Sequence, residues 1–183
     1  MRLFRKTLLA LAAIVLIASF TACDSDDYTK RGELFFTTKD YNKVPTTDYR
    51  DGYFEIAYPL DVRNIAGLSS YDYIRYVDVY DSYLSFLPLR NFRTGDYITF
   101  GLSTSRIGEY KFVIEPSGNK EAFIDTHNRD YTRFIQNLLL ELVDRGETVL
   151  YIRGYMRNAN GVGISDFEFD IESLSDLDIS IRG

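Results

Sequence analysis

The chain has 183 residues, of which 27 are acidic and 21 are basic, and its formal net charge is −6. Hydrophobic residues make up 45% of it and aromatic residues 15%, which is typical of a folded globular protein. One cysteine and one histidine exclude an internal disulfide, a cysteine-rich zinc site and a multi-histidine metal centre, and the acidic balance argues against nucleic-acid binding.

The N-terminal segment, residues 1–22, has the three parts of a secretory signal peptide. Arg2, Arg5 and Lys6 supply a positive end, an uncharged and mostly apolar stretch follows, and mostly small residues precede the only cysteine. The stretch 7–22 is shorter than the roughly 20 apolar residues that a spanning helix needs. We therefore predict a signal peptide that is removed, with a single membrane span as the alternative.

Four residues at the end of this segment, Phe20-Thr21-Ala22-Cys23, resemble the lipobox of bacterial lipoproteins. The resemblance implies that the chain is cut between Ala22 and Cys23 and that the Cys23 thiol carries diacylglycerol. It also implies that the new amino terminus is acylated. The membrane would then be a partner of the protein through its lipid, because two or more acyl chains anchor a protein stably.

The residues Cys23-Asp24-Ser25-Asp26-Asp27 are similar to the acidic export tag of surface-exposed lipoproteins of Bacteroidota. On this resemblance the residues after the cysteine, Asp24, Ser25, Asp26 and Asp27, imply an outer-membrane protein that faces the cell exterior. A solvated acidic linker is the alternative. An aspartate directly after the cysteine also resembles an inner-membrane retention signal of enterobacteria, so a periplasm-facing location stays open.

The mature chain, residues 23–183, is expected to be a tether followed by one domain. Its net charge would be −9, because the removed segment holds three of the 21 basic residues and no acidic one. Residues 23–32 are polar and predict a flexible tether that reaches about 30 Å when extended. Residues 33–183 contain no proline-rich linker and no internal repeat, and they predict a single β-rich domain.

Alternation of apolar and polar residues is the main evidence for strands. It predicts strands over residues 53–58, 97–102 and 110–115, each with one dry and one wet face. Residues 74–87 predict two strands, because the apolar positions change parity near Asp81-Ser82, where a bulge or bend must switch the faces.

A β-hairpin is predicted from residues 149–157 and 165–172, joined by a turn rich in asparagine and glycine at 158–163. Pairing with a constant index sum of 321 would place Arg153 opposite Glu168 and Ile152 opposite Phe169, so that each face is uniform. A short final strand is expected at 177–181.

One amphipathic helix is predicted over residues 131–145, with Asp130 as its N-cap and Gly146 just after its last turn. Five residues are placed on its polar face: Arg133, Gln136, Asn137, Glu141 and Asp144. The fold class is therefore mainly β. It is an antiparallel β-sandwich, for which an immunoglobulin-like form is one candidate, with this helix covering a sheet or plugging one end; a partial barrel is the alternative.

The search for catalytic and metal-binding residues favours a protein without either kind of site. His127 lies in a polar stretch before the helix, and Gly161-Val162-Gly163 fits a turn better than a phosphate loop because a strand follows it. An acidic row is expected on a wet strand face opposite Arg153 and Arg157, with calcium binding as an alternative: Asp166, Glu168, Asp170 and Glu172. We predict no catalytic residue, no metal and no cofactor.

Tyrosines are the remaining unusual feature of the sequence. One group of them could form an aromatic ligand-binding face, with ordinary strand composition as the alternative: Tyr71, Tyr73, Tyr76, Tyr80 and Tyr83. A second group is Tyr49, Tyr53 and Tyr58.

Together these observations predict a lipid-anchored, non-catalytic cell-envelope protein with a binding or assembly role at the cell surface. Its partner would be a glycan or another envelope protein, besides the membrane. A glycan-binding accessory of a surface uptake system is one alternative. A fimbrial or adhesin subunit, matured at Lys30-Arg31 by a trypsin-like protease, is the other.

Overall fold

The computed structural model describes residues 28–40, 46–47, 51–69, 72–88, 92–116 and 121–182. The predicted signal peptide, the lipobox with Ala22 and Cys23, the export tag of residues 24–27, Tyr49 and Tyr71 all lie outside these ranges. Along the chain the elements are β1 (Tyr28–Thr37), η1 (Thr38–Asp40), β2 (Tyr53–Asp61), η2 (Val62–Asn64), β3 (Ile65–Ala66), β4 (Tyr73–Pro88), β5 (Tyr97–Ser103), β6 (Tyr110–Ile114), β7 (Ala122–Asp125), α2 (Arg129–Arg145), β8 (Glu147–Arg157) and β9 (Phe169–Arg182).

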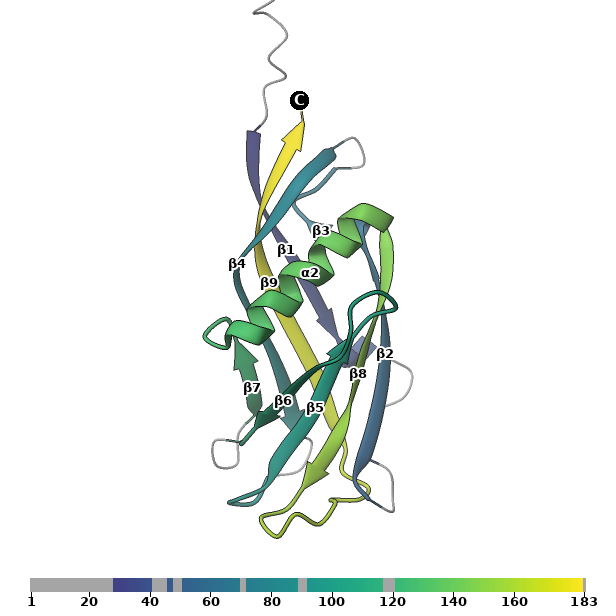
Figure 1. The fold of residues 1–183 in the computed structure, drawn as a ribbon, viewed down its shortest axis with the longest axis vertical. Coiled ribbons are helices and arrows are strands. Elements are labelled where there is room, and N and C mark those ends of the chain that lie inside the picture. The colour runs from purple at the N-terminus through teal and green to yellow at the C-terminus, as the bar shows by residue number, and fades with distance from the viewer. Residues whose placement is uncertain are drawn as a thin grey trace, which may run out of the picture.

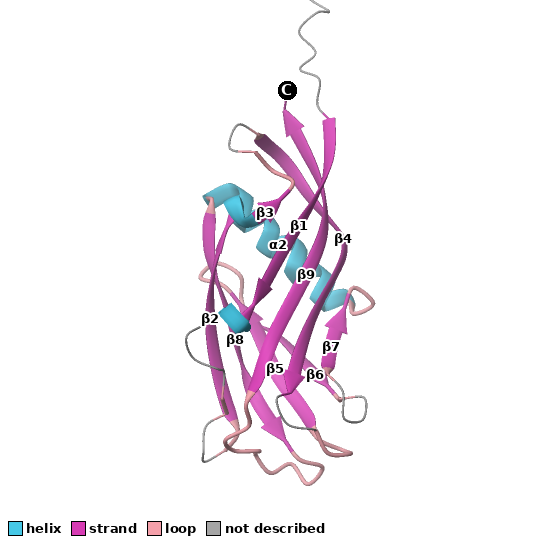
Figure 2. Ribbon diagram, turned by 180° about the vertical axis from the view of Figure 1, so that it is seen from behind, coloured by secondary structure: helices cyan, strands magenta, loops and turns pink. Residues whose placement is uncertain are grey.

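Two antiparallel sheets make up the fold, as the alternation predicted. The five-stranded sheet has the order β3-β1-β9-β4-β7 and the four-stranded sheet the order β2-β8-β5-β6. Figures 1 and 2 show the molecule from opposite sides, with the five-stranded sheet longer than its partner and α2 lying diagonally beside both. The mainly β, antiparallel sandwich with one helix is therefore confirmed, and the immunoglobulin-like form stays a prediction.

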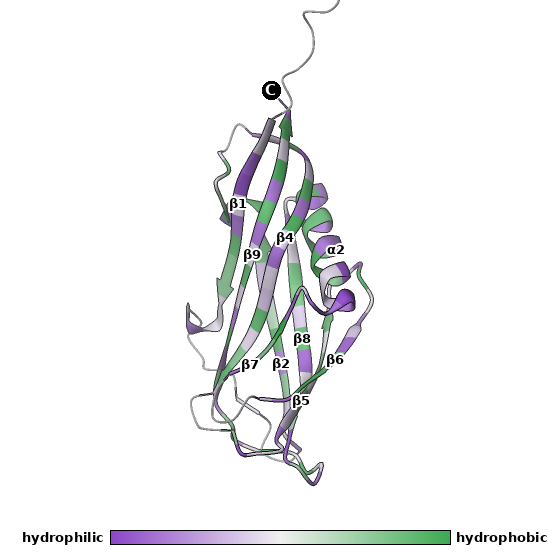
Figure 3. Cartoon of the chain, turned by 90° about the vertical axis from the view of Figure 1, so that its left-hand side faces the viewer, coloured by the Kyte–Doolittle hydropathy of each residue, from purple (hydrophilic) through white to green (hydrophobic). Residues whose placement is uncertain are grey.

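The core lies between the two sheets, where the inward residues of each strand meet. Its centre is a group of four buried rings: Phe54 and Phe100 from the four-stranded sheet, and Phe86 and Phe169 from the five-stranded sheet. Their ring centroids lie 5.0–5.9 Å apart, mostly edge to face, which aromatic rings favour. The alternating colours along β9 in Figure 3 show the same division into a dry and a wet face.

The change of parity in residues 74–87 is confirmed as a bulge, but the segment is one strand and not two. β4 runs unbroken over 16 residues against β9, and its register shifts between Ile74 and Tyr76 and again between Val79 and Asp81. The second shift turns Ser82, Leu84 and Phe86 toward the core.

The predicted hairpin is wrong. β8 lies between β2 and β5 in one sheet, whereas β9 lies between β1 and β4 in the other, so Arg153 pairs with Glu55 and not with Glu168. The asparagine- and glycine-rich segment does form a tight turn, in which Asn158 N–H donates to the Val162 carbonyl at 2.8 Å, but the chain then crosses to the other sheet. The predicted final strand at 177–181 is part of β9, whose inward residues from Phe169 to Ile181 are buried.

The tether is shorter than predicted. β1 begins at Tyr28 and pairs with β9 along all ten of its residues, so residues 28–32 are strand and not linker. Their polar character has a different cause, because Lys30 and Arg31 make ion pairs with Asp72 at 2.8 Å and Asp178 at 3.1 Å.

Helix α2 covers the opening between the sheets, packing mainly on β4 and also on β8, as the apolar stripe predicted. Gly146 ends it in the left-handed conformation at φ 80°, but Asn128 is the N-cap, not Asp130: its side chain accepts from the N–H groups of Asp130 and Tyr131. Tyr131 is buried, and its hydroxyl lies 3.0 Å from that of Ser82. Over the residues that the structure describes, no helix is long and apolar enough to cross a membrane.

Candidate functional site

A hollow of about 540 Å³ lies on the outer face of the four-stranded sheet. The strand register brings Tyr53, Tyr155 and Thr99 into one row across β2, β8 and β5, while Glu55, Arg153 and Gly101 form the next row. Gly101 has no side chain to fill the hollow, and a Cβ there would lie 2.5 Å from an oxygen of Glu109. We call this hollow the tyrosine groove and define its walls by Tyr53, Tyr155, Arg153, Glu109 and Lys111.

Aromatic and cationic side chains alternate along β8 beside the groove. The Arg153 guanidinium lies 4.7 Å from the centre of the Tyr151 ring, and the Arg157 guanidinium 4.8 Å from that of Tyr155. Across the strands the rings of Tyr53 and Tyr155 lie 5.3 Å apart. Each cation–π pair favours one position of its ring by about 0.5–1 kcal/mol, so the groove presents partly ordered aromatic surfaces.

Charged groups in the groove are paired with one another. The Glu55 carboxylate accepts hydrogen bonds from Arg153 at 2.9 Å and from the Tyr53 hydroxyl at 3.0 Å. These two hydrogen bonds lower the pKa of Glu55. Burial and the bond to Glu55 raise the pKa of Tyr53. Lys111 and Glu109 lie 3.3 Å apart. The groove therefore offers rings and hydrogen-bonding groups without an excess of either charge, which suits a neutral polar ligand.

The predicted tyrosine face lies elsewhere, on β4 in the five-stranded sheet. Tyr73, Tyr76 and Tyr80 are exposed, whereas Tyr83 is half-buried and donates to Glu172 at 3.2 Å. Burial, with the nearby Glu172 carboxylate, raises the pKa of Tyr83. The Tyr80 ring carries the Arg31 guanidinium at 4.4 Å. Tyr80 and Tyr83 line two different hollows and Tyr71 lies outside the described residues, so an aromatic ligand face built from these tyrosines stays a prediction.

The other residues of interest from the sequence occupy structural or surface positions. His127 is exposed and lies 3.0 Å from Asp125. In the acidic row, Asp170 is buried and accepts from the Thr38 hydroxyl at 3.4 Å, and Glu172 lies 3.6 Å from Lys39. Asp170 and Glu172 belong to β9 in the other sheet, whereas Asp166 lies in a turn and Glu168 forms an isolated bridge with Thr46, so the four residues do not form one row opposite Arg153 and Arg157. No group of three or more metal-ligating side chains converges within the described ranges.

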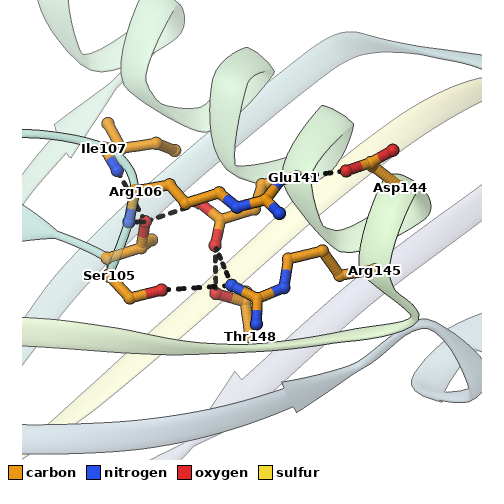
Figure 4. Close-up of polar contacts among 8 residues, drawn as sticks. Ser105, Arg106, Ile107, Glu141, Asp144, Arg145 and Thr148 are labelled. Carbon is orange, nitrogen blue, oxygen red and sulfur yellow. Dashed lines mark hydrogen bonds and ion pairs between the residues drawn. The ribbon is translucent and has the colours of Figure 1, made fainter.

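A buried carboxylate, Glu141, joins the helix to the sheets (Figure 4). It accepts from the hydroxyls of Thr104 at 2.6 Å and Thr148 at 2.8 Å, and Arg145 lies 3.7 Å away. Arg106, in the loop that contains Thr104, forms an ion pair with Asp144 at 3.0 Å. The prediction that Glu141 lies on the exposed polar face is wrong, because the loop after β5 folds over this part of the helix. Its contacts connect the helix to the sheets and do not form a ligand-binding site.

Lys30-Arg31, the candidate maturation site, lies inside β1. Both residues are paired with β9, and both side chains make the ion pairs described above. Because a protease needs an extended segment in its cleft, cleavage here requires β1 to leave the sheet first.

Comparisons with known proteins give no family. Searches of protein-family models and of curated proteins both returned no match. Among solved structures, a chain of Desmodium yellow mottle tymovirus matches at 8% identity and a TM-score of 0.33, covering 86% of this chain and 89% of its own. A chain of turnip yellow mosaic virus matches at 10% identity and a TM-score of 0.33, covering 86% of this chain and 96% of its own. Neither likeness bears on the function of this chain.

Proposed function

We propose that this protein is a lipid-anchored, non-catalytic binding protein of the cell envelope, held at the outer membrane by acyl chains on Cys23 and facing the cell exterior. The observation that carries the proposal is the lipobox, Phe20-Thr21-Ala22-Cys23, followed by the acidic run and, from Tyr28, by the first strand of the sandwich. Only four residues separate the anchoring cysteine from the folded domain.

The position of the tyrosine groove supports a binding role. β1 starts beside the C-terminal end of β9, and Figure 1 shows β8 running away from that end of the molecule. Tyr155 lies near the far end of β8, so the groove lies in the half of the domain that the anchor leaves farther from the membrane.

The first test is fractionation of cells that carry the wild-type protein or Cys23→Ala. We expect the wild-type protein to remain with the outer membrane and the variant to be released, because the acyl chains supply its stable attachment. Protease added to intact cells should degrade the wild-type protein if it faces outward. Membrane retention of Cys23→Ala to the same extent as the wild type would contradict lipid anchoring, and protection from protease would place the domain in the periplasm.

The second candidate function, glycan binding, is favoured by the paired charges and partly ordered rings of the tyrosine groove. Tyr53 and Tyr155 offer faces on which the C–H surface of a sugar ring can lie, while Glu109 and Lys111 offer an acceptor and a donor for its hydroxyls. Because the charges cancel, we propose neutral oligosaccharides rather than uronic-acid chains as ligands.

We expect Tyr155→Ala to weaken binding of a neutral oligosaccharide by about fivefold, since a ring contact of this kind contributes on the order of 1 kcal/mol. The measurement is isothermal titration calorimetry with a ligand identified on a glycan array. Tyr73→Ala is the matched control, because Tyr73 is exposed and lies on β4 in the other sheet, away from the groove. Equal losses for both variants would contradict the assignment, and silence of the whole array would remove this function.

A further inference from the structure

The exposed tyrosines of the domain gather on two strands. Among the described tyrosines only Tyr28, Tyr73, Tyr76 and Tyr80 are exposed, and all four lie on β1 or β4. Each of the others is at least partly buried. An uneven distribution of this kind indicates that one region of the surface has a role for exposed aromatic rings.

Strand register places three of these tyrosines at the same end of the sandwich. Tyr73 pairs with Arg182, Tyr28 with Ile181 and Tyr76 with Ser180, so the three rings lie at three consecutive positions along the end of β9. At about 3.3 Å per residue, these levels span roughly 7 Å. Tyr28 projects to the opposite face of the sheet from the other two, so the rings surround the tip. We call this end, formed by residues 28–30, 72–76 and 180–182, the tyrosine tip.

Covalent geometry ties the tyrosine tip to the proposed anchor. Tyr28 follows Cys23 by five residues, and a fully extended chain spans at most about 3.6 Å per residue. Tyr28 therefore cannot lie more than about 18 Å from the acylated cysteine. The opposite end of the sandwich is farther from the anchor, since β4 and β8 both end there in Figure 1.

The chemistry of the tip suits the headgroup layer and not the hydrocarbon. Tyrosine is enriched where a membrane meets water, because its ring is apolar and its hydroxyl is polar. The tip also carries three basic residues, Lys30, Arg75 and Arg182, and one acidic residue, Asp72, within a chain that is acidic overall. Figure 3 shows hydrophilic and neutral colours on β1 at this end beside green bands on β9, as expected of a surface that lies where headgroups meet the acyl chains.

We propose that the tyrosine tip docks on the phospholipid headgroup interface and so orients the domain on its membrane. The docking rests on the proposed lipid anchor, because a short tether gives the tip a high effective concentration at the bilayer and lets a weak contact persist. Asp24, Asp26 and Asp27 precede the tip in the chain and offset its basic residues. The rings therefore carry the contact, and zwitterionic phosphatidylcholine is sufficient as the partner.

The test relies on the single cysteine of the chain and on its lack of tryptophan. Cys23 is the only cysteine, so the mature chain 23–183, which contains every described element, can be coupled through its thiol to maleimide lipid in phosphatidylcholine vesicles. The chain has no tryptophan, so Tyr73→Trp introduces a single fluorescent probe at the tip. Val162→Trp is the matched control, since Val162 is 60% exposed and Tyr73 is 68% exposed, but Val162 lies in the loop after β8.

We expect the tip probe to show blue-shifted emission and loss of emission in vesicles of brominated phosphatidylcholine, and the control probe to show neither. Equal emission from the tip probe in brominated and ordinary vesicles would overturn the docking. Quenching that requires added phosphatidylglycerol would overturn the assignment to the rings. A blue shift without lipid that grows with protein concentration would identify a second copy as the occupant instead.

Chemical coupling separates this test from the test of the proposed function. The vesicle experiment holds Cys23 at the bilayer whether or not a cell acylates it. Release of the wild-type protein from cell membranes would therefore refute the anchor alone, and an unquenched tip probe in coupled protein would refute the docking alone.

Discussion

Replacing Phe86 with alanine should lower the free energy of unfolding by about 3–5 kcal/mol, as expected for removal of a fully buried ring. Phe86 has no exposed surface, and its ring centroid lies 5.0 Å from that of Phe100 and 5.8 Å from that of Phe54. Those two rings belong to the four-stranded sheet, whereas Phe86 belongs to the five-stranded sheet. Its removal therefore leaves a cavity where the two sheets meet, and the rigid strands around it cannot collapse to fill the space.

Urea unfolding, followed by far-ultraviolet circular dichroism, measures this loss. Phe123→Ala is the matched control, because Phe123 is on β7, the strand beside Phe86 in the same sheet, but is 51% exposed. We expect the control to cost less than about 1 kcal/mol. Similar losses for the two variants would mean that the packing of the sheets does not depend on the four-ring cluster.

Local features of the fold were predictable from the sequence because they depend on neighbouring residues. Alternation marks a strand wherever one face is dry, and the parity change near Asp81-Ser82 requires a bulge whatever the partner strand is. The helix was predictable for the same reason. Its N-terminus was misplaced by two residues because Asn128 and Asp130 are both good caps, and only the path of the preceding chain decides between them.

The partners of each strand were not predictable in this way. β8 and β9 have compatible alternation, and a turn-forming segment joins them, so a hairpin satisfied every local rule. The outward residue Arg153 meets an acidic residue in either arrangement, Glu168 in the predicted hairpin or Glu55 in the structure. In the structure β9 pairs with all ten residues of β1 and with β4 from Tyr73 to Pro88, and these long-range pairings are not specified by any local pattern.

The tyrosine groove was not predicted from the sequence either, because it also depends on which strands pair. Tyr53, Tyr151 and Tyr155 each fell on a recognisable wet face, but Tyr53 and Tyr155 are far apart in the chain, and only the pairing of β2 with β8 brings them together. The tyrosines crowded between positions 71 and 83 gave the stronger signal in the sequence. Crowding along one strand, however, spreads side chains over both faces and along its length, so it does not build a pocket.

Glu141 shows how tertiary context overrides a helical pattern. Its spacing places it beside the polar face of α2, yet it is buried because Thr104, in the loop after β5, and Thr148, at the start of β8, cover it from two sides. Both hydroxyls donate to its carboxylate, and the Thr104 oxygen in turn accepts from the backbone N–H groups of Arg106 and Ile107. The carboxylate thus fixes the fold of the loop through one threonine (Figure 4).

We expect Glu141→Ala to destabilise the protein by about 3 kcal/mol, because two hydrogen bonds to a charged group are lost and two hydroxyls are left in a dry site. Asp144→Ala, one turn along the same helix, is the matched control. Its ion pair with Arg106 is exposed, so its loss should cost less than about 1 kcal/mol. Urea unfolding compares the two variants.

A second measurement distinguishes a local effect of Glu141 on the loop from a general effect on stability. Trypsin cuts after arginine, and Arg106 is exposed in the loop that Glu141 holds down. If the carboxylate fixes this loop, Glu141→Ala should speed cleavage after Arg106 in mild trypsin by more than its effect on global unfolding explains. Phe86→Ala acts on the core and should speed this cleavage only through its effect on global unfolding. Equal cleavage at that site in two variants of matched stability would mean that the loop is held by its own backbone turn and that Glu141 contributes only to the packing of the helix.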